Sequence, residues 1–109
     1  MKNHVQNGRY LEVALPYARV GGEGVQVGAG LFGVATVDGA SGDVINIDTE
    51  SVYDLTAATG ASTDAAVGAL AYWDNSAKKV TPVVGTNLQI GVFLAAKATT
   101  DAIARVKIG

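Results

Sequence analysis

The stretch from Ala71 to Thr81, AYWDNSAKKVT, decides the fold class of this chain. Tyr72 and Trp73 end an apolar run, and the turn-forming residues Asp-Asn-Ser-Ala follow before a second β-type run resumes at Val80. Two such runs joined by a short polar turn are typical of a β-hairpin. We therefore predict a hairpin whose tip is not helical and whose stem carries the only Trp of the chain.

Short strand patterns lie on both sides of this hairpin. Residues 9–15 and 102–108 alternate apolar and polar side chains, as half-buried strands do. The side chains predicted to face inward are Leu11, Val13, Leu15, Ala104, Val106 and Ile108. Turn signals recur at a spacing of roughly ten residues. The chain is therefore predicted to be all-β, a small β-sandwich or barrel of short, mostly antiparallel strands with at most one short helix.

Three segments allow more than one interpretation. Residues 44–55 hold two β-branched runs split by Asp-Thr-Glu, which predicts either one long bent strand or a strand pair with a bulge. In residues 57–68, Ser62-Thr63-Asp64 is suited to cap a short helical turn that Gly68 would end. Asn7-Gly8 is a hairpin signal, but the preceding residues have only Val5 to bury, so residues 1–6 are either a partner strand or an extended N-terminal arm.

The size and composition predict one domain with a thin core. The 109 residues suit a single domain from 1 to 109, and no linker-like block and no long repeat stand out. The apolar fraction of 49% consists mostly of Ala and Val, which bury little area each. We therefore expect contacts between copies of the chain to add burial.

The charge and the absence of cysteine exclude several classes. A net charge of −2, with the basic residues scattered, argues against nucleic acid as a partner, because phosphate binding needs a basic surface. With no Cys, disulfides, thiolate metal sites and cysteine nucleophiles are excluded. The N-terminus lacks the apolar region of a signal peptide, and no apolar run reaches the ~18 residues of a membrane span. We expect a soluble protein made in a cytoplasm, without a membrane partner.

The motifs that could carry chemistry have simpler explanations. Residues 28–33 match G-x-G-x-x-G, but the sequence after Gly33 is β-branched and then broken by glycine, so a turn or bulge is favoured over a dinucleotide loop. Residues 91–98 lack the second glycine and the hydroxyl of a P-loop. His4 is the only His, which disfavours a zinc site and a catalytic triad. We therefore predict no catalytic residue, no metal ligand and no cofactor.

Carboxylates cluster between residues 43 and 54. Asp48, Glu50 and Asp54 share strand parity, and paired carboxylates can act in acid–base catalysis or bind Ca²⁺. We interpret them as a solvated polar face opposite apolar side chains, which are Ile45, Ile47, Tyr53 and Leu55.

The aromatic pair of the hairpin has two interpretations. Tyr72 and Trp73 either form an exposed patch for a partner or anchor the hairpin on the core, and the scarcity of bulky core residues favours anchoring. Lys78 and Lys79 are interpreted as a solvated hairpin edge that blocks edge-to-edge aggregation.

Four segments in order, spanning nearly the whole chain, resemble a family of short tailed-phage and prophage proteins. They are MKNHVQNG at the start, GEGVQVGAGLFGVA from Gly22, YWDNSAKKVT from Tyr72, and IGVFLAA from Ile90. The family is known as a domain of unknown function, and some members are described as capsid cement or decoration proteins. Others are labelled predicted RecA/RadA-type recombinases. The residues here argue against that label, because the chain has no P-loop, is too short for the ATPase core and is acidic.

The resemblance implies a structural virion protein. It would bind the major capsid protein on the capsid exterior as a homo-oligomer, with a trimer favoured over a dimer because symmetric oligomers suit symmetric lattice sites. Residues 1–6 are a plausible arm that adds a strand to a neighbour. The residues expected to contact the capsid or another subunit are Lys2, His4, Val5, Tyr72 and Trp73. Two alternatives are a nucleic-acid-binding accessory protein of phage recombination and another head- or tail-associated module.

Overall fold

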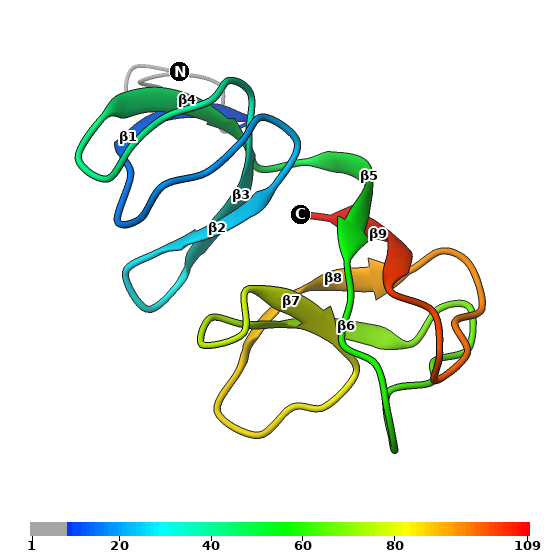
Figure 1. Ribbon diagram of the computed structural model, residues 1–109. Coiled ribbons are helices and arrows are strands. Elements are labelled where there is room, and N and C mark those ends of the chain that lie inside the picture. Colours follow the sequence, from blue (N-terminus) through cyan, green and yellow to red (C-terminus); the bar gives the residue numbers. More distant parts are fainter. Residues whose placement is uncertain (1–8) are drawn as a thin grey trace.

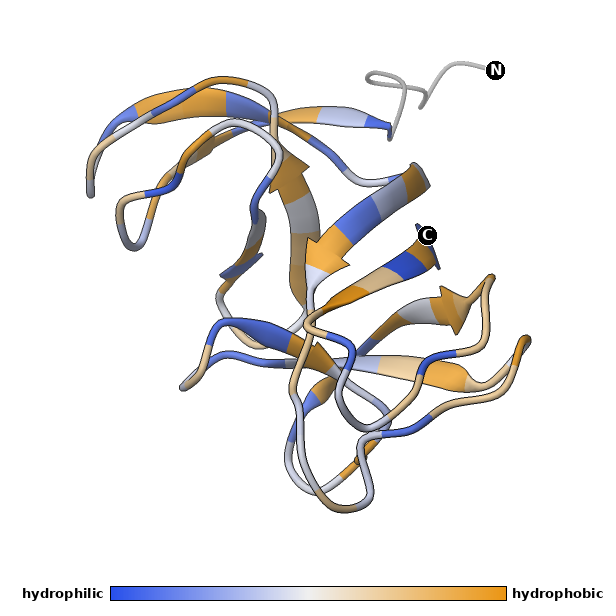
Figure 2. Ribbon diagram, turned by 45° about the vertical axis from the view of Figure 1, so that its right-hand side comes forward, coloured by the Kyte–Doolittle hydropathy of each residue, from blue (hydrophilic) through white to orange (hydrophobic). Residues whose placement is uncertain are grey.

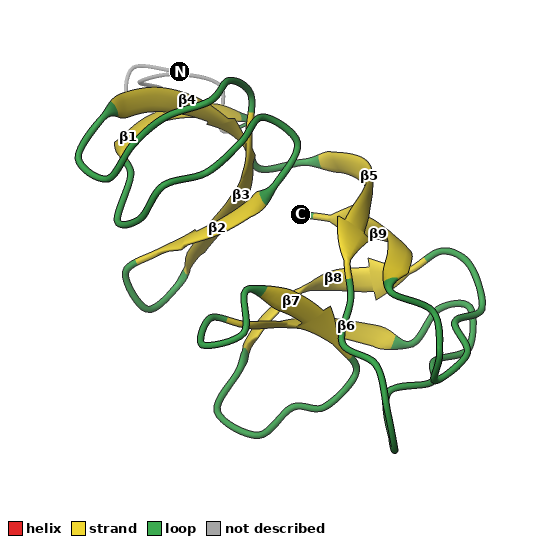
Figure 3. Ribbon diagram, in the orientation of Figure 1, coloured by secondary structure: helices red, strands yellow, loops and turns green. Residues whose placement is uncertain are grey.

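The computed structural model describes residues 9–109, which form nine β-strands connected by loops. Figure 3 shows no helix in this part of the chain. The strands are β1 (Tyr10–Ala14), β2 (Gly24–Val27), β3 (Leu31–Ala35), β4 (Val44–Asp48), β5 (Ser51–Thr56), β6 (Leu70–Asp74), β7 (Lys79–Thr81), β8 (Leu88–Phe93) and β9 (Ile103–Ile108). The all-β prediction is confirmed.

The strands form two antiparallel sheets (Figure 1). The first sheet has the order β1-β4-β3-β2, and the second has the order β5-β9-β8-β6-β7. The second sheet curls into a half-barrel, because β7 at one edge returns toward β5 at the other. A parallel bridge joins Ala57 to Val80, and the Ala58 amide donates to the Val80 carbonyl at 2.8 Å.

The two sheets repeat one arrangement of strands. With β7 set aside, each sheet has four strands, of which the first pairs with the last, the last with the third, and the third with the second. Strands β1, β2, β3 and β4 therefore correspond to β5, β6, β8 and β9. We call residues 10–48 the first unit and residues 51–108 the second unit; β7 is an addition to the second. The sequence shows no long repeat, whereas the structure repeats a topology.

The connecting loops repeat as well. Within the first unit, Arg19 and Gly39 exchange backbone hydrogen bonds of 3.0 and 2.9 Å, and within the second unit Ala65 and Lys97 exchange bonds of 2.9 and 2.8 Å. A tight turn begins directly after Arg19, Gly39 and Lys97, and in each turn an acidic side chain accepts a hydrogen bond from the first amide. The Val20 amide donates to Glu23 Oε1 at 2.8 Å, the Ala40 amide to Asp43 Oδ2 at 2.9 Å, and the Ala98 amide to Asp101 Oδ2 at 2.9 Å.

Alternation of side chains along the strands builds the core, as Figure 2 shows for hydropathy. The inward prediction for residues of β1 and β9 is confirmed, since Leu11 and Val13 are half-buried while Ala104, Val106 and Ile108 are buried. Leu15 is buried just after β1.

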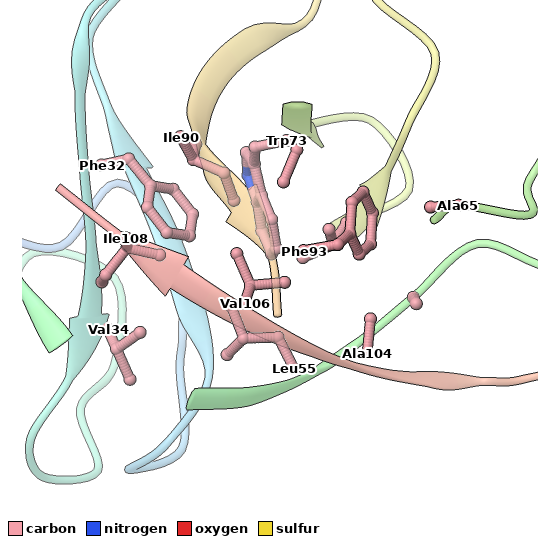
Figure 4. Packing of buried hydrophobic residues seen from close by; sticks show 13 residues of the cluster. Phe32, Val34, Leu55, Ala65, Trp73, Ile90, Phe93, Ala104, Val106 and Ile108 are labelled. Atoms are coloured by element: carbon pink, nitrogen blue, oxygen red, sulfur yellow. The ribbon is translucent and has the colours of Figure 1, made fainter. Parts of the chain in front are cut away.

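The buried apolar residues form two clusters. The smaller one lies inside the first unit and centres on Val25, Ala35 and Ile47. The larger one fills the second unit, and Figure 4 shows two residues of the first unit packed into it, Phe32 beside Trp73 and Val34 near Ile108. Because β3 contributes to both clusters, one on each face, it ties the two units together.

The structure decides between the alternatives for residues 57–68, 44–55 and 28–30. Residues 57–68 form no helix, because the Ala65 amide and carbonyl bond Lys97 across the unit instead of neighbours along the chain. Residues 44–55 form neither one bent strand nor a bulged pair: β4 and β5 belong to different sheets. Residues 28–30 are the turn between β2 and β3, as the turn interpretation predicted. The Asn7-Gly8 signal and the proposed arm of residues 1–6 lie outside the described residues, and a single domain from 1 to 109 stays a prediction.

Candidate interaction surface

The residues predicted to contact a partner fall in two places. Tyr72 and Trp73 lie on β6, within the hairpin that β6 forms with β7, whereas Lys2, His4 and Val5 lie outside the described residues. The hairpin therefore carries the part of the prediction that the structure can place.

Trp73 packs inside the molecule and anchors the hairpin. Its side chain is 2% exposed, and its ring centroid lies 5.0 Å from that of Phe32 on β3 with the planes tilted by 52°. Its indole Nε1 donates to Asn75 Oδ1 at 3.1 Å, so the polar end of the buried ring is satisfied. Tyr72, next along the strand, points to the other face and is half-buried. The anchoring interpretation is thus confirmed for Trp73.

The hairpin turn is held by its own side chains. Asp74 Oδ1 accepts from the amides of Ser76 and Ala77 at 3.0 and 3.2 Å, and the Lys78 amide donates to the Asp74 carbonyl at 2.7 Å. Lys78 has a positive φ of 56°, which the side-chain bonds of Asp74 support. The turn predicted from the polar residues is therefore present and well ordered by hydrogen bonds.

Tyr17 connects the hairpin to the first unit. Its hydroxyl donates to Asn75 Oδ1 at 2.8 Å and accepts from the Gln26 amide on β2 at 3.0 Å. Lys78 Nζ lies 4.5 Å and Arg19 Cζ 5.2 Å from the centre of the Tyr17 ring, which is cation–π distance. The two units are consequently joined by polar contacts as well as by the Phe32–Trp73 packing.

Asp48 forms a second polar junction, and this corrects the sequence interpretation of its side chain. Asp48 is buried at 1% exposure, although a solvated face was predicted. Its carboxylate accepts from Tyr53 Oη at 2.6 Å, from the Glu50 amide at 3.1 Å and from the Arg9 guanidinium at 3.3 Å. It is buried because it ends β4 where the chain crosses from one sheet to the other. Glu50 and Asp54 are exposed as predicted, and Asp54 pairs with Arg105 at 3.0 Å.

The electrostatics of this junction are those of a structural contact. Burial by itself raises the pKa of Asp48, but the hydrogen bonds from Tyr53, the Glu50 amide and Arg9 outweigh it and hold the pKa below its usual value. Burial and the bond to Asp48 raise the pKa of Tyr53 to about 12. At neutral pH the acid stays ionised and the phenol protonated, so neither group is poised to exchange a proton with a substrate.

One concave part of the surface is a shallow open groove beside the Arg19–Gly39 bridge. It is lined by Ala18, Arg19, Val20, Glu23, Asp38, Gly39 and Ala40. The Arg19 guanidinium already donates to the carbonyls of Ala18 and Gly24, at 2.8 and 3.3 Å. The groove therefore offers no uncommitted basic group to a ligand.

Residues 9–109 hold neither a candidate metal site nor a helix suited to cross a membrane. No cluster of three His, Cys, Asp or Glu side chains there has the arrangement of a metal site. In the same residues, no helix has the length and hydropathy to cross a membrane.

One comparison with known proteins gave a match. A sequence model of a family described as phage cement protein matches residues 5–108. Neither a curated protein nor a solved structure matches the chain. The matched range includes all nine strands and both polar junctions, so the similarity concerns the whole fold and not one motif.

Proposed function

The chain belongs to the phage cement protein family, and from this membership we propose that it binds the exterior of a phage or prophage capsid and stabilises it. The observation that carries the proposal is the match over residues 5–108. The family gives the chain a structural, capsid-associated role in the virion.

The surface supports a binding role. Eleven large apolar side chains of residues 9–109 are exposed, among them Val20, Val44 and Val67 at 58%, 61% and 64%. A chain with a small core that leaves this much apolar area outside has surface to cover on association. The junctions at Asp48 and Tyr17 hold its two units together, as a protein under mechanical load on a capsid requires. We expect no enzymatic activity.

We propose that the major capsid protein is the partner and that the chain acts as a homo-oligomer, with a trimer favoured over a dimer. Lys2, His4, Val5 and Tyr72 are the proposed contact residues. Trp73, being buried, would contribute by holding Tyr72 and the hairpin in place. Synthesis would take place in the bacterial host cytoplasm before assembly on the capsid.

A reconstitution experiment tests the proposal. Capsids of a producing strain that lack this chain are mixed with the purified protein, and co-sedimentation and the temperature of capsid disruption are measured. We expect saturable binding and a higher disruption temperature. Lys2→Glu should weaken binding, and Asp64→Lys, at an exposed loop residue of the second unit, is a charge reversal outside the proposed contact that should leave binding unchanged. Absence of binding to capsids of the producing strain would contradict the proposal.

A further inference from the structure

The repeated topology places two equivalent rows of residues, one on each sheet, on the face that points away from the core of that sheet's own unit. Register pairs link Tyr10 to Asp48, Asp48 to Val34 and Val34 to Gly24 across the first unit. The equivalent pairs link Val52 to Lys107, Lys107 to Val92 and Val92 to Leu70 across the second unit. We call these the first row and the second row.

The second unit covers most of the first row. Val34 and Asp48 are each 1% exposed, and Gly24 is buried. Asp48 bonds Tyr53 of β5, and a Cβ at Gly24 would lie 2.9 Å from the Trp73 ring. Within one chain, therefore, the first row packs against the end of the second unit that carries Tyr53 and Trp73.

No segment of residues 9–109 covers the second row in the same way. Val52 and Leu70 are 48% and 46% exposed, Val92 is half-buried and Lys107 is exposed. The apolar area continues at the ends of β6 and β8. Leu94 is 40% exposed and Val67 is 64% exposed, and the hydrogen bond from the Gly68 amide to the Phe93 carbonyl, 2.7 Å, joins their neighbours.

The first unit has an end that matches the one covering the first row. Leu11 corresponds to Tyr53 by register, and Val27 follows Gly24 by three residues as Trp73 follows Leu70. Leu11 and Val27 are half-buried and apolar, packed against the edge of the smaller cluster. Lys107 takes the place of Asp48, and its long side chain can lie along apolar surface with the ammonium group in water.

From this equivalence we propose that the second row docks a second copy of the chain, through the Leu11 and Val27 end of that copy's first unit. The contact between copies repeats the contact between units within one chain. It joins two different surfaces, so it is heterologous; such a contact forms a ring when the rotation from one copy to the next closes, and an open filament when it does not. A ring of three copies would present six units in sequence. The inference rests on the homo-oligomer of the proposed function and deepens it, because it names the surfaces through which the copies meet.

The first test measures the native mass of the chain and two variants. Leu70→Glu puts a charge in the centre of the second row, and we expect it to raise the dissociation constant of the oligomer about thirtyfold, as loss of a central apolar contact does. Val37→Glu is the matched control, because Val37 is 53% exposed and lies in the first unit, away from the row. A wild-type monomer, or a Leu70→Glu oligomer as stable as the wild type, would overturn the proposal.

The second test does not depend on the stability of a charged variant. The chain has no Cys, so a Leu70→Cys chain can be mixed with a Val27→Cys chain under oxidising conditions. We expect the disulfide between the Leu70→Cys and Val27→Cys chains to form at least tenfold faster than the disulfide between Val37→Cys and Val27→Cys chains. Equal rates would overturn the proposal. The proposal would also be overturned if the wild type were a monomer and Leu70→Glu lost only its capsid binding, since the second row would then dock the capsid.

Discussion

Replacing Gly91 by Ala should destabilise the protein much more than replacing Gly33, although the two occupy equivalent strand positions. Gly33 precedes Val34, which pairs with Asp48 on β4, and Gly91 precedes Val92, which pairs with Lys107 on β9. A Cβ at Gly91 would lie 2.8 Å from the Lys107 carbonyl carbon and closer still to its oxygen. A Cβ at Gly33 would lie 2.7 Å from Ile47 Cδ1, the far end of a flexible side chain, and 3.1 Å from the Asp48 carbonyl oxygen, a gap that needs a shift of only a few tenths of an ångström.

The magnitudes follow from what must move. Overpacking costs about 1–3 kcal/mol. We expect about 1 kcal/mol for Gly33→Ala, where a side chain gives way, and about 3 kcal/mol for Gly91→Ala, where backbone of the β8–β9 pair must shift. For 109 residues at roughly 2.1 cal/mol/K each, the unfolding entropy is about 0.23 kcal/mol/K. The melting temperature should therefore fall by about 4 °C and about 13 °C.

Thermal unfolding followed by circular dichroism measures both variants. Gly30→Ala is the control, because nothing lies within 4 Å of a Cβ there, and its melting temperature should stay near that of the wild type. If Gly91→Ala melted within a few degrees of the wild type, the close approach of β8 to β9 at this position would be in error.

Four further predictions concern the junctions and the function. Because its hydrogen bonds hold the pKa of Asp48 below the usual value, its contribution to stability is present above about pH 4 and is lost as the pH falls through the folded-state pKa; in urea titrations Asp48→Asn should be less stable at pH 7 and depend less on acid. Because burial and Asp48 raise the pKa of Tyr53 to about 12, the native state should lose stability between about pH 10 and 12, and Tyr53→Phe should remove that loss. Tyr17→Phe removes the bonds to Asn75 and Gln26 and should lower the unfolding free energy by about 1–3 kcal/mol, which chemical denaturation would measure; an unchanged value would mean that the hydroxyl does not link the units. A labelled single-stranded oligonucleotide should show no salt-sensitive binding in fluorescence anisotropy, because the net charge is −2; binding that weakens with salt would revive the nucleic-acid alternative.

Local patterns predicted the parts of the fold that depend on neighbouring residues. The turn after Trp73 and the alternation in β1 and β9 are each contained within about ten residues, and the structure confirms them. Burial of Trp73 was also predictable, because a chain with few bulky side chains needs each of them in its core.

Features that depend on contacts distant in the sequence could not be predicted in this way. Asp48 is buried because Arg9, 39 residues away, and Tyr53 on the other sheet satisfy it. Lys97 is buried because its Nζ donates to the Thr63 and Ala98 carbonyls at 2.9 and 3.0 Å. The residues next to Asp48 and Lys97 in the sequence do not predict that either side chain is buried.

The repeated unit lies between these two cases. The segments Ala40-Ser41-Gly42-Asp43 and Ala98-Thr99-Thr100-Asp101 close equivalent turns with the same side-chain bond. Their shared pattern of Ala, a hydroxyl residue and a final Asp is a signal of the repeat. It is too short to stand out until the pairing of the strands shows that the two turns are equivalent.

The central claim is that the chain is a structural protein on the capsid exterior, and electron cryomicroscopy of particles from a producing strain tests it most directly. We predict density for the two-sheet fold at regular, symmetry-related positions on the outer capsid surface. Particles in which the chain is absent, or in which it occurs only at the tail, would contradict the claim.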